Sequence, residues 1–151
     1  MSSLANVHDV ANYILSKQTP MSAMKLQKLV YYSKAWHLVW DTSELFPERV
    51  QAWANGPVVF ELYEAHRGRF MVDSWPAGDS AMLTHAEKGS IDAVLAFYGP
   101  KPAHELSELT HSERPWRDAR GSLEPGERGN AEIPSASMYE FYDGLVGLGE
   151  Q

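Results

Sequence analysis

The sequence contains no cysteine, which excludes disulfide bonds, thiolate metal sites and cysteine nucleophiles. It has no apolar run near the roughly 18 residues that a transmembrane helix needs. The first residues lack the basic segment and apolar stretch of a signal peptide. We therefore expect a cytoplasmic protein without a membrane partner. Its 151 residues suit one domain, spanning 1–151.

Positive charge is also scarce. Thirteen lysines and arginines face 20 aspartates and glutamates, for a net charge of −7. The imbalance is confined to one half, because residues 1–75 carry seven acids and seven bases. Proteins that bind duplex DNA or RNA usually present a basic stripe that displaces counterions from phosphates. The charge therefore argues against a nucleic-acid partner.

Recognisable catalytic motifs are missing. There is no Gly-x-Ser-x-Gly nucleophile elbow, no phosphate-binding Walker loop and no Gly-x-Gly-x-x-Gly dinucleotide loop. One metal-ligand candidate remains, because His104, Glu108 and His111 would share a helix face at spacing i, i+4, i+7. A metal-dependent hydrolase is thus an alternative, although solvated or capping roles suit these side chains better. We expect no enzyme, no metal and no cofactor.

Hydrophobic periodicity predicts a mainly α-helical domain of about six to seven helices around a long central helix, 22–40. The remaining helices are expected at 6–17, 57–66, 84–98, 102–109 and 112–120, with a last one starting near residue 137. Alternation at 49–53 and a second segment at 69–75 predict a short two-stranded hairpin. Residues 121–132 read as a flexible loop and 147–151 as a frayed tail.

Several polar residues allow both a structural and a functional interpretation. The central helix is locally basic because it contains Lys25, Lys28 and Lys34. We interpret these lysines as a solvated outer face rather than as a phosphate-binding site. His37 reads as a core histidine with one hydrogen bond. Arg117 and Arg120 could grip an anion from one helix face, but pairing of Arg120 with an internal carboxylate or carbonyl is the favoured interpretation.

Three segments carry a family resemblance. The run Leu26-Gln-Lys-Leu-Val-Tyr-Tyr-Ser-Lys-Ala-Trp-His37 resembles the signature helix of the Panacea domain, the SocA-like antitoxin family also seen in phage-associated proteins. Gln51-Ala-Trp-Ala-Asn-Gly-Pro-Val58, with Tyr63 after it, resembles the family's turn into a helix. Leu106-Ser-Glu-Leu-Thr-His-Ser-Glu-Arg-Pro-Trp-Arg-Asp-Ala-Arg120 resembles its third block.

The resemblance implies an antitoxin that neutralises a protein toxin encoded by the adjacent gene. In this family the toxins include alarmone-synthetase-like enzymes that modify tRNA. An alternative is an adaptor that delivers the toxin to an AAA+ protease, as some members do. DNA-binding extensions occur in the family, but this chain's first helix begins near residue 6, which puts autoregulation by DNA binding in doubt.

We expect the matched residues to be mostly structural, with Trp36, Trp53 and Trp116 as large core anchors. The motif residues are Lys25, Leu26, Gln27, Lys28, Tyr31, Trp36, His37, Trp53, Gly56, Pro57, Tyr63, Thr110, His111, Glu113, Pro115, Trp116 and Arg120. Partner specificity would then lie at exposed positions. Because a toxin that acts on tRNA should have a basic site, Glu124, Glu127 and Glu132 are the expected toxin contacts.

Overall fold

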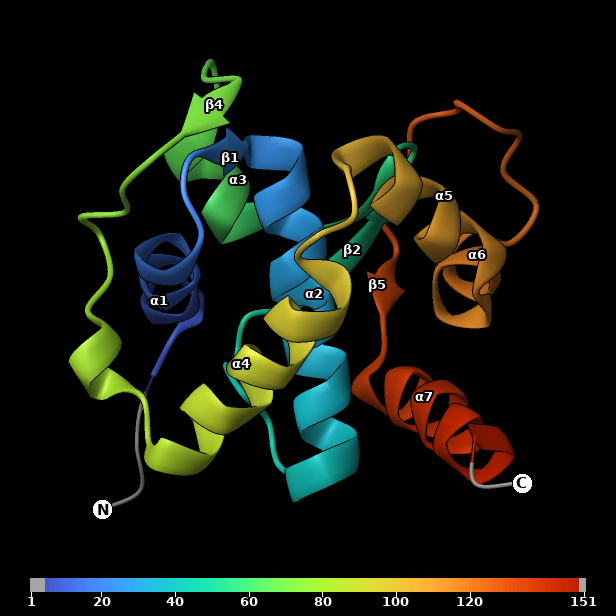
Figure 1. The fold of residues 1–151 in the computed structure, drawn as a ribbon. Helices are drawn as coiled ribbons and strands as arrows, with labels where there is room; N and C mark the ends of the chain where they lie inside the picture. The colour runs from blue at the N-terminus through green and yellow to red at the C-terminus, as the bar shows by residue number, and fades with distance from the viewer. Residues whose placement is uncertain (1–4, 150–151) are drawn as a thin grey trace.

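A computed structural model describes residues 5–149 of the chain, with side chains described through residue 146. This part forms seven α-helices, one short 3₁₀ helix and five short strands (Figure 1). In order, they are α1 (Val7–Lys17), β1 (Met21–Ser22), α2 (Ala23–Asp41), β2 (Val50–Trp53), β3 (Gly56–Val59), α3 (Phe60–His66), β4 (Met71–Val72), η1 (Ser80–Met82), α4 (His85–Tyr98), α5 (Ala103–Ser112), α6 (Arg114–Arg120), β5 (Glu132–Ile133) and α7 (Ser135–Gly149). The prediction of a mainly helical fold is confirmed.

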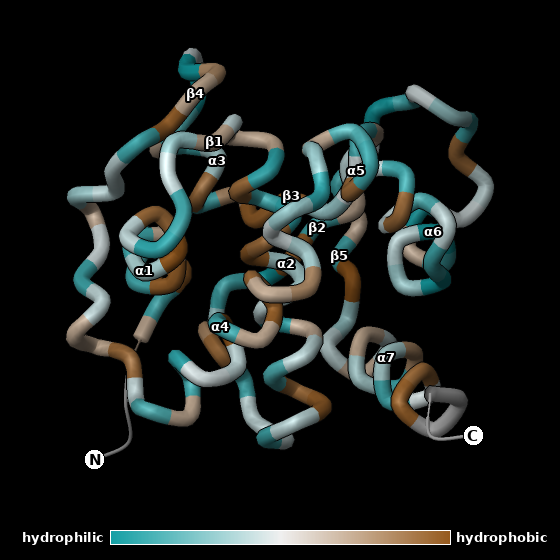
Figure 2. The backbone as a smooth tube through the Cα atoms, in the orientation of Figure 1, coloured by the Kyte–Doolittle hydropathy of each residue, from teal (hydrophilic) through white to brown (hydrophobic). Residues whose placement is uncertain are grey.

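Helix α2 lies at the centre of the molecule, as predicted, with α1, α4, α5 and α7 packed around it (Figure 1). Its apolar side chains, such as Leu26, Leu29 and Val30, are fully buried. In Figure 2 the hydrophobic residues of α1 lie on the side that faces α2. Polar residues of α2 are buried too, so the helix is enclosed on nearly every side rather than amphipathic.

Local capping signals fix where the helices begin. The Asn6 side chain accepts from the His8 and Asp9 amides, and Asp9 accepts from the Asn6 amide, which makes a capping box for α1. Ser22 caps α2 by accepting from the Lys25 amide at 3.1 Å. Both residues were predicted as caps from the sequence alone.

The predicted hairpin between 49–53 and 69–75 is wrong in its pairing. Strand β2 pairs with β3 and with β5 in a three-stranded antiparallel sheet, ordered β3-β2-β5. Strand β4 pairs instead with β1. Only residues 54–55 separate β2 from β3, so this turn closes a much shorter loop than pairing with 69–75 would require.

The helix expected at 57–66 begins later, at Phe60. The three residues before it belong to β3, and Pro57 is tolerated there because β3 is an edge strand. The side-chain amide of buried Gln27 in α2 makes the pair of hydrogen bonds to β3 that a backbone amide of a neighbouring strand would make. It accepts from the Val59 N–H at 2.9 Å and donates to the Val59 carbonyl at 3.2 Å.

Two predicted terminal or loop segments differ in detail. The tail expected to fray at 147–151 is helical as far as Gly149, and residues 150–151 lie outside the described part of the chain. The last residue of the 121–132 loop, Glu132, begins strand β5. The Ala52 amide also donates to the Ala131 carbonyl at 2.8 Å, so the end of this loop is tied to β2.

Candidate functional site

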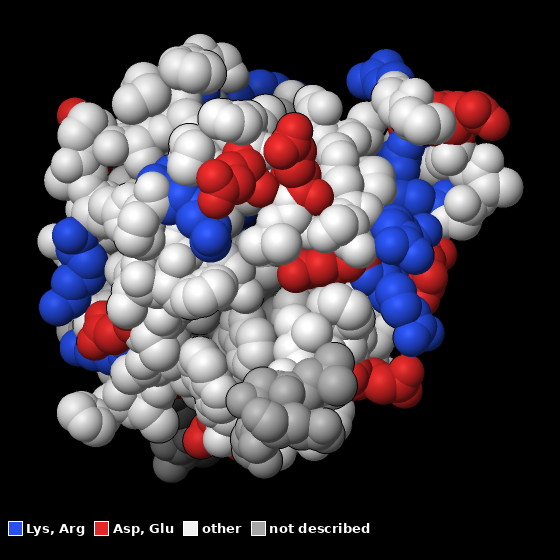
Figure 3. Space-filling view, turned by 45° about the vertical axis from the view of Figure 1, so that its right-hand side comes forward, with Lys and Arg blue, Asp and Glu red and all other residues white. Residues whose placement is uncertain are grey.

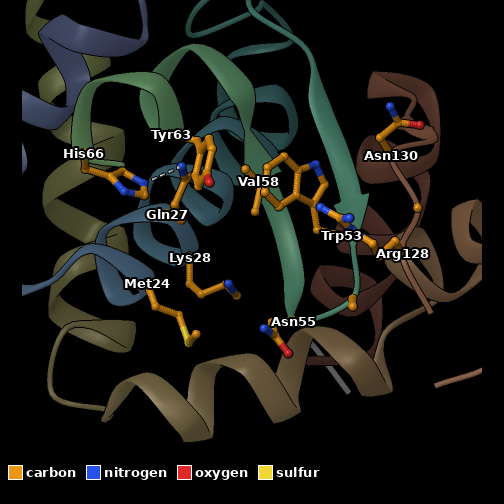
Figure 4. Close-up of a pocket in the computed structure, with 12 residues that line it drawn as sticks. Met24, Gln27, Lys28, Trp53, Asn55, Val58, Tyr63, His66, Arg128 and Asn130 are labelled. Atoms are coloured by element: carbon orange, nitrogen blue, oxygen red, sulfur yellow. Dashed lines mark hydrogen bonds between the residues drawn. The ribbon is translucent and has the colours of Figure 1, made fainter. Parts of the chain in front are cut away.

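A cavity of about 650 Å³ opens between α2, the β2–β3 hairpin, α3 and the loop that follows α6 (Figure 4). It is lined by Met24, Gln27, Lys28, Trp53, Ala54, Asn55, Val58, Tyr63, His66, Arg128, Gly129 and Asn130. Four of these, Gln27, Lys28, Trp53 and Tyr63, are among the motif residues predicted to be mostly structural. Cavities of this size are typical of small-molecule sites.

Lys28 is the unusual residue of this cavity. Its side chain is 2% exposed and runs toward the cavity between Met24 and Asn55 (Figure 4). Within residues 5–149, no group forms a hydrogen bond or ion pair with its ammonium. Burial without a partner lowers the pKa of Lys28 to about 8. The expectation that Lys28 lies on a solvated outer face is therefore wrong.

Gly56 makes room for the end of Lys28. A β-carbon at this position would lie 2.4 Å from Lys28 Cε, 3.0 Å from Nζ and 3.3 Å from the Thr110 hydroxyl oxygen. Its φ of +127° is also strained for any residue with a side chain. Gly56 was predicted as a turn residue, and here it also allows a buried ammonium to lie against the hairpin.

Gln27 and His66 close one wall of the cavity. Because the Gln27 oxygen accepts from Val59, its amide nitrogen faces the His66 ring and donates to Nε2 at 3.0 Å. The His66 proton is therefore placed on Nδ1. Burial lowers the pKa of His66, and the charges of Arg69 and Lys28 lower it further. Because His66 is neutral, it adds no positive charge beside Lys28 on this wall.

Helices α5 and α6 brace the hairpin from the other side. Trp116 donates from its indole nitrogen to the Trp53 carbonyl at 2.8 Å. The His111 ring stacks on Trp116 with ring centres 4.1 Å apart, and burial lowers the pKa of His111. Arg120, 6% exposed, donates to the Ala52 carbonyl at 3.4 Å.

Arg120 also holds the loop that completes the cavity. Its second terminal nitrogen donates to the carbonyls of Glu124 at 3.2 Å and Glu127 at 2.6 Å. The favoured reading, an arginine paired with internal carbonyls, is confirmed. Arg117 is exposed and donates to the Ser112 carbonyl, so the two arginines do not grip an anion together.

A second polar cluster lies on another side of α2, around Glu113. One carboxylate oxygen accepts from the hydroxyls of Tyr32 at 2.9 Å and Tyr142 at 2.7 Å. Tyr31 reaches the Tyr142 hydroxyl at 3.1 Å. Burial raises the pKa of Glu113, although the two tyrosine hydrogen bonds oppose the shift. The cluster ties the junction between α5 and α6 to α2 and α7.

Glu113→Gln tests the cost of this buried charge. A folded-state pKa above the ordinary value means that the folded protein binds the extra proton, so ionisation reduces stability as pH rises. The unfolding free energy of Glu113→Gln should therefore improve relative to the wild type between about pH 4 and pH 7. Urea unfolding across this range measures the difference. Exposed Glu140→Gln is the control and should give a flat difference; an equally flat Glu113→Gln result would contradict the shift.

The other motif residues lie in the core or at its edge. Leu26 and Tyr31 are fully buried, and Pro115 lies in the first turn of α6. Lys25 donates to the Gly99 carbonyl at 2.6 Å. His37 is a core histidine as predicted, but with two hydrogen-bonding contacts rather than one: Nδ1 lies 2.7 Å from the Ser90 hydroxyl and Nε2 lies 3.2 Å from the Ser43 hydroxyl.

The remaining positions differ in exposure. Lys34, also expected on a solvated face, is 3% exposed and donates to the Glu48 carbonyl. Trp36 and Trp116 are partly buried against the core, whereas Trp53 lines the cavity.

The metal-ligand candidate is not assembled. His104 and Glu108 are exposed on α5, whereas the His111 ring lies against Trp116. Among the described residues, no three histidine, aspartate or glutamate side chains are placed to hold one ion. None of the helices between residues 5 and 149 is long and apolar enough to cross a membrane.

A comparison with protein families identifies the family. Residues 26–117, more than half of the chain, match the model for the antitoxin SocA-like Panacea domain. The chain belongs to this family. Neither a curated protein sequence nor a solved structure matches it. The matched span of this Panacea domain contains most of the cavity wall, from Gln27 through His66, and the His111 and Trp116 part of the α5–α6 brace, whereas Arg120 lies just beyond it.

Part of the cavity was missed by sequence reasoning. Arg128 and Asn130 lie beyond the matched span, in the segment read as a flexible loop. His66 and Met24 also line the cavity, and no periodicity or motif distinguished them. The buried lysine could have been suspected, since Lys28 sits within a motif beside Gln27 and Leu29.

Proposed function

We propose that this Panacea domain is the antitoxin of a toxin–antitoxin pair and neutralises its toxin by direct binding. The observation that supports this proposal is the family membership over residues 26–117. The family suggests a binding role rather than catalysis. The toxin would be encoded by the adjacent gene, and an alarmone-synthetase-like enzyme that modifies tRNA is the toxin class to test first.

Co-expression with the adjacent gene tests the proposal. The toxin alone should stop growth, growth should return when this chain is produced, and the two proteins should co-purify. An interface of roughly 800 Å² on each partner would suffice for a stable complex. Toxin that stays lethal without forming a complex would overturn the proposal.

The same experiment separates sequestration from proteolysis. If the chain acts by direct binding alone, the half-life of the toxin stays the same when growth is restored. If the toxin disappears faster in the presence of this chain, the protein acts as an adaptor for an AAA+ protease. Deleting that protease should then abolish neutralisation.

We further propose that Glu124, Glu127 and Glu132 contact the toxin. All three are exposed, and the Glu132 carboxylate forms a surface ion pair with Arg49 at 3.7 Å. The charge pattern sets a limit on this idea, because acidic side chains on the face drawn in Figure 3 lie beside basic ones, which form a column down its right-hand side. Any steering by the three acids would therefore act locally.

Reversing these three charges tests the contact. Replacing Glu124, Glu127 and Glu132 by lysine should slow association with a basic toxin about tenfold and flatten its salt dependence, because electrostatic complementarity acts mainly on association rates. Stopped-flow mixing at several salt concentrations measures both effects. The matched control reverses exposed Glu61, Glu64 and Asp73, which lie on α3 and after β4. Equal rates for the two triple variants would contradict the assignment.

A further inference from the structure

The cavity beside α2 combines a buried cation with aromatic walls. Lys28 is almost completely buried, its ammonium has no partner among residues 5–149, and it faces the open space (Figure 4). Burying an unpaired ammonium is costly, and such groups are normally paired or hydrogen-bonded. An anion in the cavity would supply the missing partner.

The rest of the lining also favours an anion. Arg128 is a second cation on the opposite side, and the described lining residues include no aspartate or glutamate. Asn55 and Asn130 offer amide donors. The cavity therefore offers two positive charges and several neutral donors to a negatively charged group.

Size and aromatic surface narrow the ligand class. Trp53 and Tyr63 pack edge to face with ring centres 4.9 Å apart, and Val58 adds apolar surface beside them. A planar ring can stack on such walls. A single carboxylate side chain from a protein partner would leave most of the roughly 650 Å³ empty.

We propose that this cavity binds a nucleoside phosphate, with the phosphate beside Lys28 and the base against Trp53 and Tyr63, while Arg128 adds positive charge from the opposite side. The site is independent of toxin neutralisation and does not rest on it. Gly56 serves the site, because any β-carbon there would displace the Lys28 ammonium. Arg120 serves it too, because it holds the loop from which Arg128 and Asn130 project.

Binding should weaken as pH rises from 7 to 9. The titratable and charged groups around Lys28 are Tyr63 and His66 on α3, His111 on α5 and Arg128 in the loop. Burial keeps the pKa values of both histidines below their ordinary value, so they are neutral throughout this range. An arginine stays charged. Lys28, with a pKa of about 8, loses its charge within the range.

Titration with the four common nucleoside monophosphates, followed by amide NMR, tests the proposal. At least one of AMP, GMP, CMP and UMP should shift the amides of Asn55, Gly56 and Gly129, whereas its nucleoside and inorganic phosphate alone should bind at least tenfold more weakly. Lys28→Met should weaken binding at least tenfold and remove the pH dependence. Lys28→Gln should do the same, and exposed Lys17→Met should leave the affinity unchanged.

Three outcomes would overturn the proposal. The first is that no nucleotide shifts these amides at 10 mM. The second is that Lys28→Met and Lys28→Gln, with native circular dichroism spectra, bind as tightly as the wild type. The third is that a blocked glutamate peptide shifts the amides and nucleotides do not, which would make the occupant a carboxylate of a protein partner.

Discussion

Lys28→Met should raise the unfolding free energy at pH 7 by about 3 kcal/mol. The lysine is 2% exposed and its pKa is lowered to about 8, well below the ordinary lysine value of 10.5, because the ammonium is desolvated. Methionine has a similar length and no charge, so it fills the same space without that cost. Urea unfolding at pH 7 measures the change.

The difference in unfolding free energy between Lys28→Met and the wild type should depend on pH. Between about pH 8 and pH 10 the unfolded chain keeps the Lys28 proton and the folded chain has lost it, so raising the pH increases wild-type stability. Lys28→Met lacks this contribution, and its advantage over the wild type should shrink across the range. Shifts at Lys25 and Lys34 are shared by both proteins and largely cancel in the difference.

Lys17→Met is the control, because Lys17 is exposed in the last turn of α1. It should change stability by less than about 0.5 kcal/mol. If Lys28→Met destabilises the protein instead, the ammonium has a stabilising role in the folded state that burial alone does not describe. A stabilising result would mean that this residue is retained at the expense of stability, as is common for functional sites.

Features of the fold that depend on neighbouring residues could be predicted from the sequence, whereas the pairing of distant strands could not. The caps at Asn6 and Ser22 were predicted correctly because each cap bonds to amides within three residues. The pairing of 69–75 was wrong because a two-residue strand has too little pattern to select its partner. Here β4 pairs with β1, and the Phe70 carbonyl accepts from the Ala23 amide.

The candidate site was predicted less well, and Lys28 shows why. Helix periodicity indicates which residues share a face, but not whether a second layer covers the polar face. In this fold the β2–β3 hairpin and α5 cover Gln27 and Lys28. The segment before β2 covers Lys34, whose ammonium donates to the Glu48 carbonyl and lies 4.6 Å from the Phe46 ring centre. Arg128 enters the cavity through tertiary contacts made by Arg120, which no local pattern reports.

Arg120→Met should be the most damaging change near this site, lowering the unfolding free energy by about 3 kcal/mol. Buried Arg120 donates to the carbonyls of Ala52, Glu124 and Glu127, and each hydrogen bond is assisted by its charge. Its guanidinium also lies 5.4 Å from the Trp116 ring centre. Methionine would leave three carbonyls without this donor and a gap beside the indole.

Arg120→Met should also make the loop after α6 more mobile. Once the carbonyls at 124 and 127 are released, backbone amides of 124–130 should exchange with solvent faster in Arg120→Met than in the wild type. The exchange rates of the α2 amides should change only as much as the global unfolding free energy changes. Arg120→Lys keeps the charge without the planar fork of donors and should recover only part of the loss. Arg117→Met, three residues earlier and exposed, should leave both measurements near wild type. Unchanged exchange at 124–130 in Arg120→Met would show that the loop is held by its strand β5 and the Ala52–Ala131 hydrogen bond instead.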